Sequence, residues 1–222
     1  MPTDAPPTDR TRVRRKAERG RYDRATVDAI LDEALLCHVG FAVDGRPWVL
    51  PTAFARVGDH LYLHGAAGNF ALRSLAAGVE ACVAVTLLDG LVLSRSAFHH
   101  SMNYRSVLVF GTAEAVRDEQ EKRAAVMAIV EHLIPGRTDA ARPPSMEELR
   151  ATLVVRLPLD EASAKIRTGP PLEDDDDLDL EHWAGVLPLT LQPGEPIPDE
   201  FTSARYAGTA PEHVTRWCRP ES

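Results

Sequence analysis

The residues best suited to chemistry in this chain of 222 residues lie in two short polar segments. In the first, a strand-like stretch ending at His64 leads through a small-residue loop, residues 65–68, to a helix start carrying Asn69 and Arg73. A helix start presents free N–H groups and a positive dipole end to anions, and glycine lets a phosphate approach the backbone. The pattern predicts a phosphate site, with an ordinary strand-to-helix turn as the alternative.

The second segment, residues 96–107, is polar and aromatic and contains the pair His99 and His100. Neighbouring side chains on an extended chain point in opposite directions, so at most one of the two imidazoles is expected to serve one small site. Zinc needs four ligands, and no Cys or carboxylate stands at ligand spacing nearby, which argues against a metal site. We expect one histidine at a ligand mouth, or two that only order a loop.

A third feature is Pro51, which interrupts a strand pattern and so indicates an edge strand or a bulge. A bulge would free backbone groups for a ligand, whereas an edge strand needs no further role. The sequence has no GxSxG, HExxH, P-loop or GxGxxG motif, and hydrolase chemistry is therefore unsupported.

The elements that must position these segments follow from hydrophobic periodicity. Turn residues at Asp44-Gly45, Gly58-Asp59 and Asp89-Gly90 separate strands that follow one another too closely for βαβ units. The pattern indicates a mainly β protein, a small closed or partly closed barrel with flanking helices. We expect helices over residues 25–36, 70–77, 118–133 and 146–150, and strands over 38–43, 48–55, 60–64, 81–88, 91–97, 104–116 and, last, 152–159.

Composition limits the partners and the compartment. A net charge of −8 argues against nucleic-acid binding, and no apolar run reaches the length of a membrane span or a signal peptide. Three cysteines without CxxC spacing fit a reducing cytoplasm. We expect a disordered tail over 1–14, one barrel domain over 15–167 and a partly irregular extension over 168–222.

Two charge blocks stand apart from this average. Residues 10–24 are strongly basic, and residues 174–177 are four consecutive aspartates. A solvated tail and a solvated loop are the simplest interpretations. The basic arm has two alternatives, a nucleic-acid or partner-binding segment and an arm that folds across a dimer partner.

In this order, the segments resemble the pyridoxamine 5′-phosphate oxidase-like split-barrel proteins, in particular a flavin-nucleotide-binding branch with nitroimidazole-reductase-like members. The resemblance covers about residues 15–188 and is most specific over 94–107, with Gly111 and residues 183–188 also matching. It implies a six-stranded antiparallel FMN-binding split barrel that forms a homodimer, with FMN at the interface.

The resemblance also implies roles for residues. Pro51 and Thr52 would line the isoalloxazine ring through their backbone, and the loop and helix start would hold the phosphate. The complete set expected at the cofactor is Pro51, Thr52, His64, Gly65, Asn69, Arg73, Ser74, Tyr104, Arg105 and Ser106.

The expected activity is that of an FMN-dependent oxidoreductase acting on a small organic substrate, with His64 or His100 as the proton donor. Residues 71–74 read Ala-Leu-Arg-Ser, where pyridoxamine phosphate oxidases have a Ser-Arg-Lys stretch, so vitamin B6 oxidation is not expected. The alternative is a flavin- or haem-binding sensor or storage protein without turnover, for which His99 or His100 would be an axial ligand.

Overall fold

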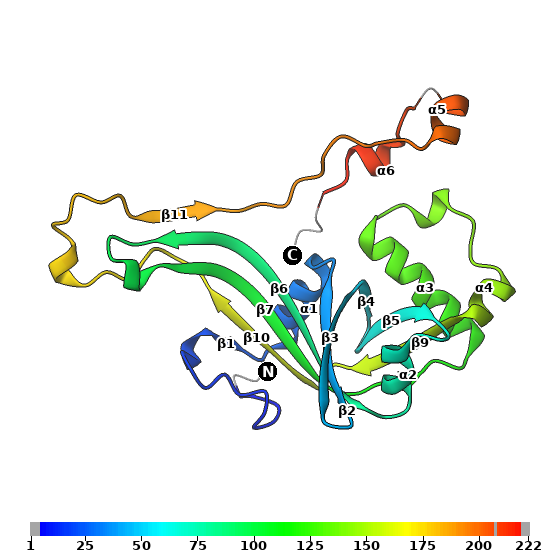
Figure 1. Cartoon of the computed structure of the whole chain (residues 1–222), viewed down its shortest axis with the longest axis horizontal. Coiled ribbons are helices and arrows are strands. Elements are labelled where there is room, and N and C mark those ends of the chain that lie inside the picture. Colours follow the sequence, from blue (N-terminus) through cyan, green and yellow to red (C-terminus); the bar gives the residue numbers. More distant parts are fainter. Residues whose placement is uncertain (1–4, 207, 219–222) are drawn as a thin grey trace.

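The computed structural model describes residues 5–206 and 208–218 and consists of two antiparallel sheets with helices at their flanks (Figure 1). The larger sheet has the strand order β1-β10-β7-β6-β2-β3, with β11 also paired to β6, and the smaller has the order β4-β5-β9-β8. The strands of the larger sheet are β1 (Gly20–Arg21), β2 (Cys37–Val43), β3 (Arg46–Thr52), β6 (Glu80–Leu93), β7 (Ser101–Thr112), β10 (Glu161–Arg167) and β11 (Gly185–Pro188). Those of the smaller are β4 (Phe54–Val57), β5 (His60–Ala66), β8 (Glu114–Ala115) and β9 (Thr152–Pro158).

Helices close the ends and flanks of these sheets. Helix α1 starts after Asp23, whose side chain accepts a hydrogen bond from the Thr26 N–H at 2.8 Å, and it buries Val27, Ile30 and Leu31. The α-helices are α1 (Arg24–Glu33), α2 (Phe70–Ala76), α3 (Glu119–Leu133), α4 (Met146–Ala151), α5 (Glu200–Tyr206) and α6 (Glu212–Thr215). Short 3₁₀ turns occur at η1 (Ala17–Arg19), η2 (Ala97–His99), η3 (Thr138–Ala140) and η4 (Asp175–Asp177).

The core lies between the two sheets and α1, as the alternation along the strands predicts. On β7, Val107 and Val109 are fully buried, whereas Leu108 between them is 40% exposed on the outer face. Leu61 and Leu63 of β5 meet this core from the smaller sheet. The predicted mainly β split barrel with flanking helices is therefore confirmed.

The strand expected over residues 48–55 is two strands that belong to different sheets. β3 pairs with β2 at the edge of the larger sheet, and after Ala53 the chain enters β4 of the smaller sheet. Pro51 therefore stands in an edge strand, as predicted. The sequence pattern does not show this division, because residues 48–55 contain no Gly, Asn or Asp that would mark a turn between two strands.

The turn predicted at Asp89-Gly90 is wrong. Residues 80–93 form one strand, with a β-bulge between Leu88 and Gly90. Gly90 is needed there for space, because a Cβ atom would lie 3.0 Å from the Leu187 carbonyl oxygen of β11. By contrast, the hairpin turn at Asp44-Gly45 is confirmed, with φ of 51° and 74°.

The prediction that residues 152–159 form the last strand is also wrong. β10 follows at once and crosses into the larger sheet between β1 and β7, and β11 adds to β6. Small residues such as Ala162 and Ala164 carry the buried face of β10, and they gave a weak apolar pattern. Figure 1 shows β6 and β7 as a long curved hairpin, with β11 beside it.

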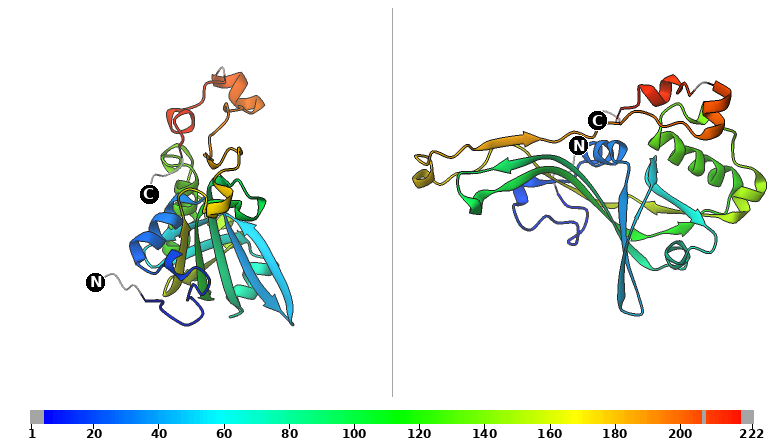
Figure 2. Two further views of the ribbon diagram at one scale, coloured as in Figure 1. Left: turned by 90° about the vertical axis from the view of Figure 1, so that its left-hand side faces the viewer. Right: turned by 45° about the horizontal axis from the view of Figure 1, so that its top comes forward.

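Described segments near both ends of the chain contact this body. Within the tail expected over residues 1–14, Arg10 forms ion pairs with Glu80 and Glu161, and Thr11 is buried. Residues 1–4 of that tail lie outside the described residues. Figure 2 shows the segment after β11 running back towards α3, where Trp217 Nε1 donates to the Leu133 carbonyl at 2.9 Å. Among the described residues, none of the helices has both the length and the apolar character needed to cross a membrane.

Candidate functional site

The candidate site is a pocket of about 190 Å³ where the end of β3, β5 and α2 meet. It brings together four of the residues predicted from sequence, Pro51, Thr52, His64 and Asn69. Apolar side chains make up the rest of the lining, namely Val39, Leu50, Leu63, Ala71, Leu72 and Leu75. An apolar cavity with a few convergent polar groups is the usual form of a small-molecule or cofactor site.

His64 is the one titratable side chain in the pocket lining. Its Nδ1 atom is buried and has no hydrogen-bond partner. Burial lowers the pKa of His64 below its usual value of 6.5, because desolvation disfavours the imidazolium. The ring is therefore neutral at pH 7 and presents a nitrogen lone pair, which a metal or a hydrogen-bond donor of a bound group would satisfy.

The loop after His64 is held tightly. A Cβ atom on Gly65 would lie 2.9 Å from Leu72 Cδ1, so glycine allows β5 and α2 to approach closely. Asn69 caps α2, because its side-chain oxygen accepts the Leu72 N–H at 3.1 Å. The Ala67 N–H is bound to the Ala151 carbonyl at 2.8 Å. Part of the polar backbone expected to bind phosphate thus serves the fold.

Arg73 is an available cation beside this loop. It is exposed, and it forms no ion pair with any described residue. Ser74, in contrast, donates its hydroxyl to the Phe70 carbonyl at 2.9 Å within α2. An anion near the pocket would therefore be attracted by Arg73 first.

The predicted cofactor residues of β7 lie away from this pocket. Arg105 donates both to Glu33 at the end of α1 and to Asp89 of the β6 bulge, with nitrogen-to-oxygen distances of 2.8 Å to each. Both carboxylates raise the pKa of Arg105 above its usual value, and Asp89 has the larger effect. The guanidinium joins α1 to the bulge within the chain.

Tyr104 and Ser106 lie on the opposite face of β7 from Arg105, because side chains alternate along a strand. The Ser106 hydroxyl donates to the Lys165 carbonyl at 3.2 Å, and Tyr104 is opposite Arg167 in the β-ladder. Within a single chain, the three predicted residues of β7 therefore do not line the pocket that contains His64.

His100 is equally remote from His64. It follows η2 at the end of the β6–β7 hairpin, which Figure 1 and Figure 2 place at the far end of the molecule from α2. Its Nδ1 atom is 3.0 Å from the Ser96 carbonyl, and the side chain is exposed. A hydrogen bond from Nδ1–H to that carbonyl leaves Nε2 with the lone pair that metal ligation requires.

An open apolar surface, which was not predicted, runs across the outer face of the larger sheet. Side-chain alternation places it on the face away from the core, and Val49 is the most exposed of its members at 66%. The sequence could have indicated this surface, because apolar residues occur on both faces of β3, β6 and β7. Periodicity alone does not show which of two apolar faces is exposed. The surface consists of Val49, Leu88, Leu91, Met102 and Leu108, and at Leu108 it adjoins residues 10–14 of the same chain.

The chain forms two antiparallel sheets, with a histidine-bearing pocket where they meet, and this arrangement defines a split barrel. The sequence pattern of the family described as pyridoxamine 5′-phosphate oxidase matches residues 23–166. The chain belongs to this flavin-binding family. Among curated proteins, none matches the chain.

Solved structures extend the likeness over almost the whole length. The flavocytochrome Anf3 from Azotobacter vinelandii is 41% identical, with a TM-score of 0.88, covering 97% of this chain and 99% of that one. The FAD and haem binding protein from Mycobacterium smegmatis is 39% identical, with a TM-score of 0.83 and coverages of 89% and 96%. A Bacteroides thetaiotaomicron structure assigned to 5-nitroimidazole antibiotic resistance is 26% identical, with a TM-score of 0.56 and coverages of 66% and 86%.

Proposed function

We propose that this chain is a redox protein that binds both a flavin and a haem. The observation that carries the proposal is the near full-length similarity to two structures, one described as a flavocytochrome and the other as an FAD and haem binding protein. Flavin alone was the main expectation from sequence, with haem as an alternative. The comparisons favour the two together, and they favour FAD over the FMN expected from the family resemblance.

The residues of the pocket fit such a group. The buried, unpartnered Nδ1 of His64 lacks the partner that a buried polar atom normally has, and the apolar lining suits a planar ring system. A bound flavin would supply one- and two-electron chemistry, and a bound haem would supply one-electron chemistry. The protein contributes orientation, exclusion of water and the local charge.

Specific roles follow from the geometry already described. His64, neutral at pH 7, is suited to accept a hydrogen bond or to ligate iron, and less suited to the proton donation first expected of it. His100 offers a free Nε2 and is the second candidate for the iron ligand or the proton donor. Arg73, with Asn69 and Ser74 near it, would attract the phosphate of a flavin or a haem propionate.

A second copy of the chain is part of this proposal. At about 190 Å³ the pocket is smaller than the roughly 300–1,000 Å³ typical of ligand sites, so a single chain encloses only part of a cofactor. The open apolar surface of the larger sheet, Val49 to Leu108, would be covered in a homodimer. The dimer would also bring His100 and β7 of one subunit near the pocket of its partner.

Three free cysteines, one of them buried at Cys37, support the expected reducing cytoplasm as the compartment. A small organic molecule is the proposed electron acceptor or donor. Nucleic acid is not proposed as a partner, because the net charge is −8.

The test is to identify the cofactors of the purified protein by absorption spectroscopy and native mass spectrometry. We expect flavin bands together with a Soret band, and FAD released on denaturation. His64→Ala should lose or shift one of these spectra, whereas the matched change His60→Ala, at the opposite end of β5, should not. A protein that binds neither added flavin nor added haemin would refute the proposal.

The second candidate, an FMN-dependent oxidoreductase without haem, is favoured by the family match and by the likeness to the nitroimidazole resistance structure. Flavin bands without a Soret band, FMN as the released flavin and turnover of a reducible organic substrate with NADH or NADPH would select it. His100→Ala then tests the proton donor, because an unchanged rate removes that role.

A further inference from the structure

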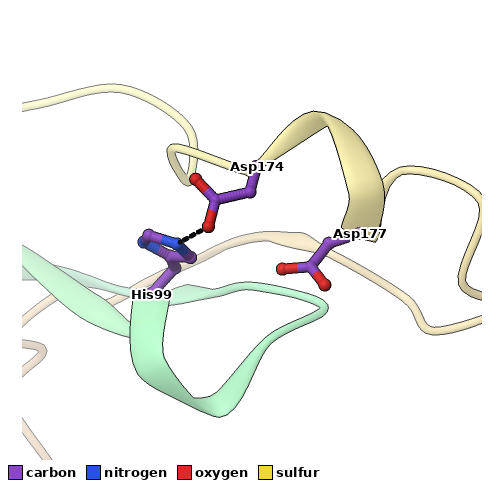
Figure 3. Close-up of side chains that lie close together, drawn as sticks. All are labelled: His99, Asp174 and Asp177. Atoms are coloured by element: carbon purple, nitrogen blue, oxygen red, sulfur yellow. Dashed lines mark hydrogen bonds and ion pairs between the residues drawn. The ribbon is translucent and has the colours of Figure 1, made fainter.

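The acidic run at residues 174–177 and His99, distant in sequence, meet at the end of the β6–β7 hairpin. His99 ends η2, and Asp174 precedes η4, which the other three aspartates form in the segment between β10 and β11. The His99 Nε2 atom lies 3.0 Å from Asp174 Oδ2, and Figure 3 shows the Asp177 carboxylate directed towards the same space. Sequence spacing argued against a metal here, because no carboxylate stands near His99 along the chain.

The three side chains have the composition and spacing of a metal centre. One ligand atom from each of His99, Asp174 and Asp177 lies within 4.8 Å of the others, and in the described residues this is the one group of three that does so. Zinc binds His nitrogen and Asp oxygen at about 2.0–2.2 Å, which places ligand atoms roughly 3.4 Å apart. Side-chain shifts of about 1 Å would close the difference.

The surrounding fold holds the two segments together independently of the three ligands. Glu173, next to Asp174, accepts hydrogen bonds from the Ser94 hydroxyl at 2.8 Å and from the Arg95 backbone N–H at 3.2 Å. The Glu173 side chain is only 9% exposed. These hydrogen bonds hold the start of the acidic run against the hairpin. The aspartates are therefore held near His99 by contacts outside the three ligands.

The local charge favours binding of a cation. Among the described residues, the four carboxylates of residues 174–177 form no ion pair with Lys or Arg, and the nearby Arg95 pairs with Glu173. Like charges held together destabilise the folded state, and a divalent ion would offset that repulsion. The imidazole adds a nitrogen ligand, which favours transition metals over magnesium or calcium.

We propose that His99, Asp174 and Asp177 bind one divalent transition-metal ion of the zinc class, with water completing its coordination. The ion links the end of the β6–β7 hairpin to the segment that leads into β11. It thereby orders the loop that carries His100. This site is separate from the pocket at His64 and does not depend on the identity of the flavin or haem.

The test measures Zn²⁺ binding to the full chain, as purified, by titration calorimetry and native mass spectrometry. We expect one Zn²⁺ per chain, with affinity reduced at least tenfold in His99→Ala and in Asp177→Asn. The matched control is Asp176→Asn, which removes the same charge from the same turn outside the three ligands and should change the affinity less than twofold. Circular dichroism of each variant verifies that it is folded.

Hydrogen exchange gives a second measurement. Zn²⁺ should slow exchange over residues 95–100 in the natural sequence and leave it unchanged in His99→Ala. Absence of Zn²⁺ binding, equal loss in Asp176→Asn and Asp177→Asn, or Mg²⁺ binding as tight as Zn²⁺ would each overturn the proposal, because each indicates no site or only diffuse attraction to negative charge.

Discussion

At the scale of single residues, His64 links the candidate pocket to a measurable dependence on pH. Its pKa is lowered by burial, so below about pH 6.5 the unfolded chain takes up a proton that the folded chain resists. Stability contributed by this neutral histidine is complete above the unfolded pKa and falls as the pH drops below it. The sign follows from the unfolded state binding more protons over that range.

We therefore expect His64→Gln to lose less stability than the natural sequence between pH 7 and pH 5, in the cofactor-free protein. The free energy of unfolding, obtained from denaturant unfolding at several pH values, measures this difference. His38→Gln, at an exposed position, is the control and should follow the natural sequence. Parallel pH curves for the His64 variant and the natural sequence would contradict the burial of a neutral imidazole.

Arg105 has a different role in the structure from the one that the sequence resemblance implied. The sequence resemblance placed it at the flavin, and the structure gives it two carboxylate partners, one on α1 and one at the β6 bulge. Both are more than 15 residues away along the chain, and spacing alone gives no sign of them. Within one subunit, Arg105 therefore has a positioning role.

At the scale of elements, the β6 bulge and β11 depend on each other. β11 passes so close to Gly90 that an added Cβ atom would meet the Leu187 carbonyl oxygen at 3.0 Å and Val186 Cγ1 at 3.2 Å. A backbone oxygen cannot move aside as the end of a flexible side chain can. The bulge thus creates the space in which β11 adds to the sheet.

Gly90→Ala should release β11 from β6, with a loss of stability of about 1–3 kcal/mol, because overpacking forces backbone shifts. Hydrogen exchange of the backbone amides over residues 185–188 should become faster. Gly194→Ala is the matched control, since nothing lies within 4 Å of the Cβ position there. Unchanged hydrogen exchange at β11 in the Gly90 variant would show that the pairing of β11 with β6 does not depend on the space at Gly90.

At the scale of the whole molecule, the open surface of the larger sheet is the feature that one chain leaves unexplained. Met102 is 50% exposed and Leu88 is 42% exposed, on strands that form the centre of the fold. Exposed apolar side chains that gather on one face of a sheet often mark an interface. The proposed homodimer accounts for both this surface and the small size of the pocket.

Met102→Glu should convert the dimer to a monomer and weaken flavin retention, because a charge would be buried without a partner. Sedimentation velocity measures the first effect, and flavin content per chain measures the second. Val57→Glu, on the exposed edge of the smaller sheet, should change neither. A Met102→Glu protein that stays dimeric with full flavin content would remove this face from the interface.

Sequence periodicity was sufficient for part of the local structure. The helix after Asp23, the hairpin turn at Asp44-Gly45 and the buried and exposed faces of β7 all depend on neighbours within a few residues. The family was also determined by the sequence, because residues 23–166 carry its pattern. These features follow from propensity, turn chemistry and alternation, which act over short distances.

The tertiary structure decided which of the predicted site residues meet. It brought Pro51, Thr52, His64 and Asn69 to one pocket and placed Arg105 on the helix side of β7. It also divided residues 48–55 between two sheets and carried Asp174 to His99. Such contacts join residues tens of positions apart, and they depend on which strands pair and how closely backbones can pass, which no local pattern records.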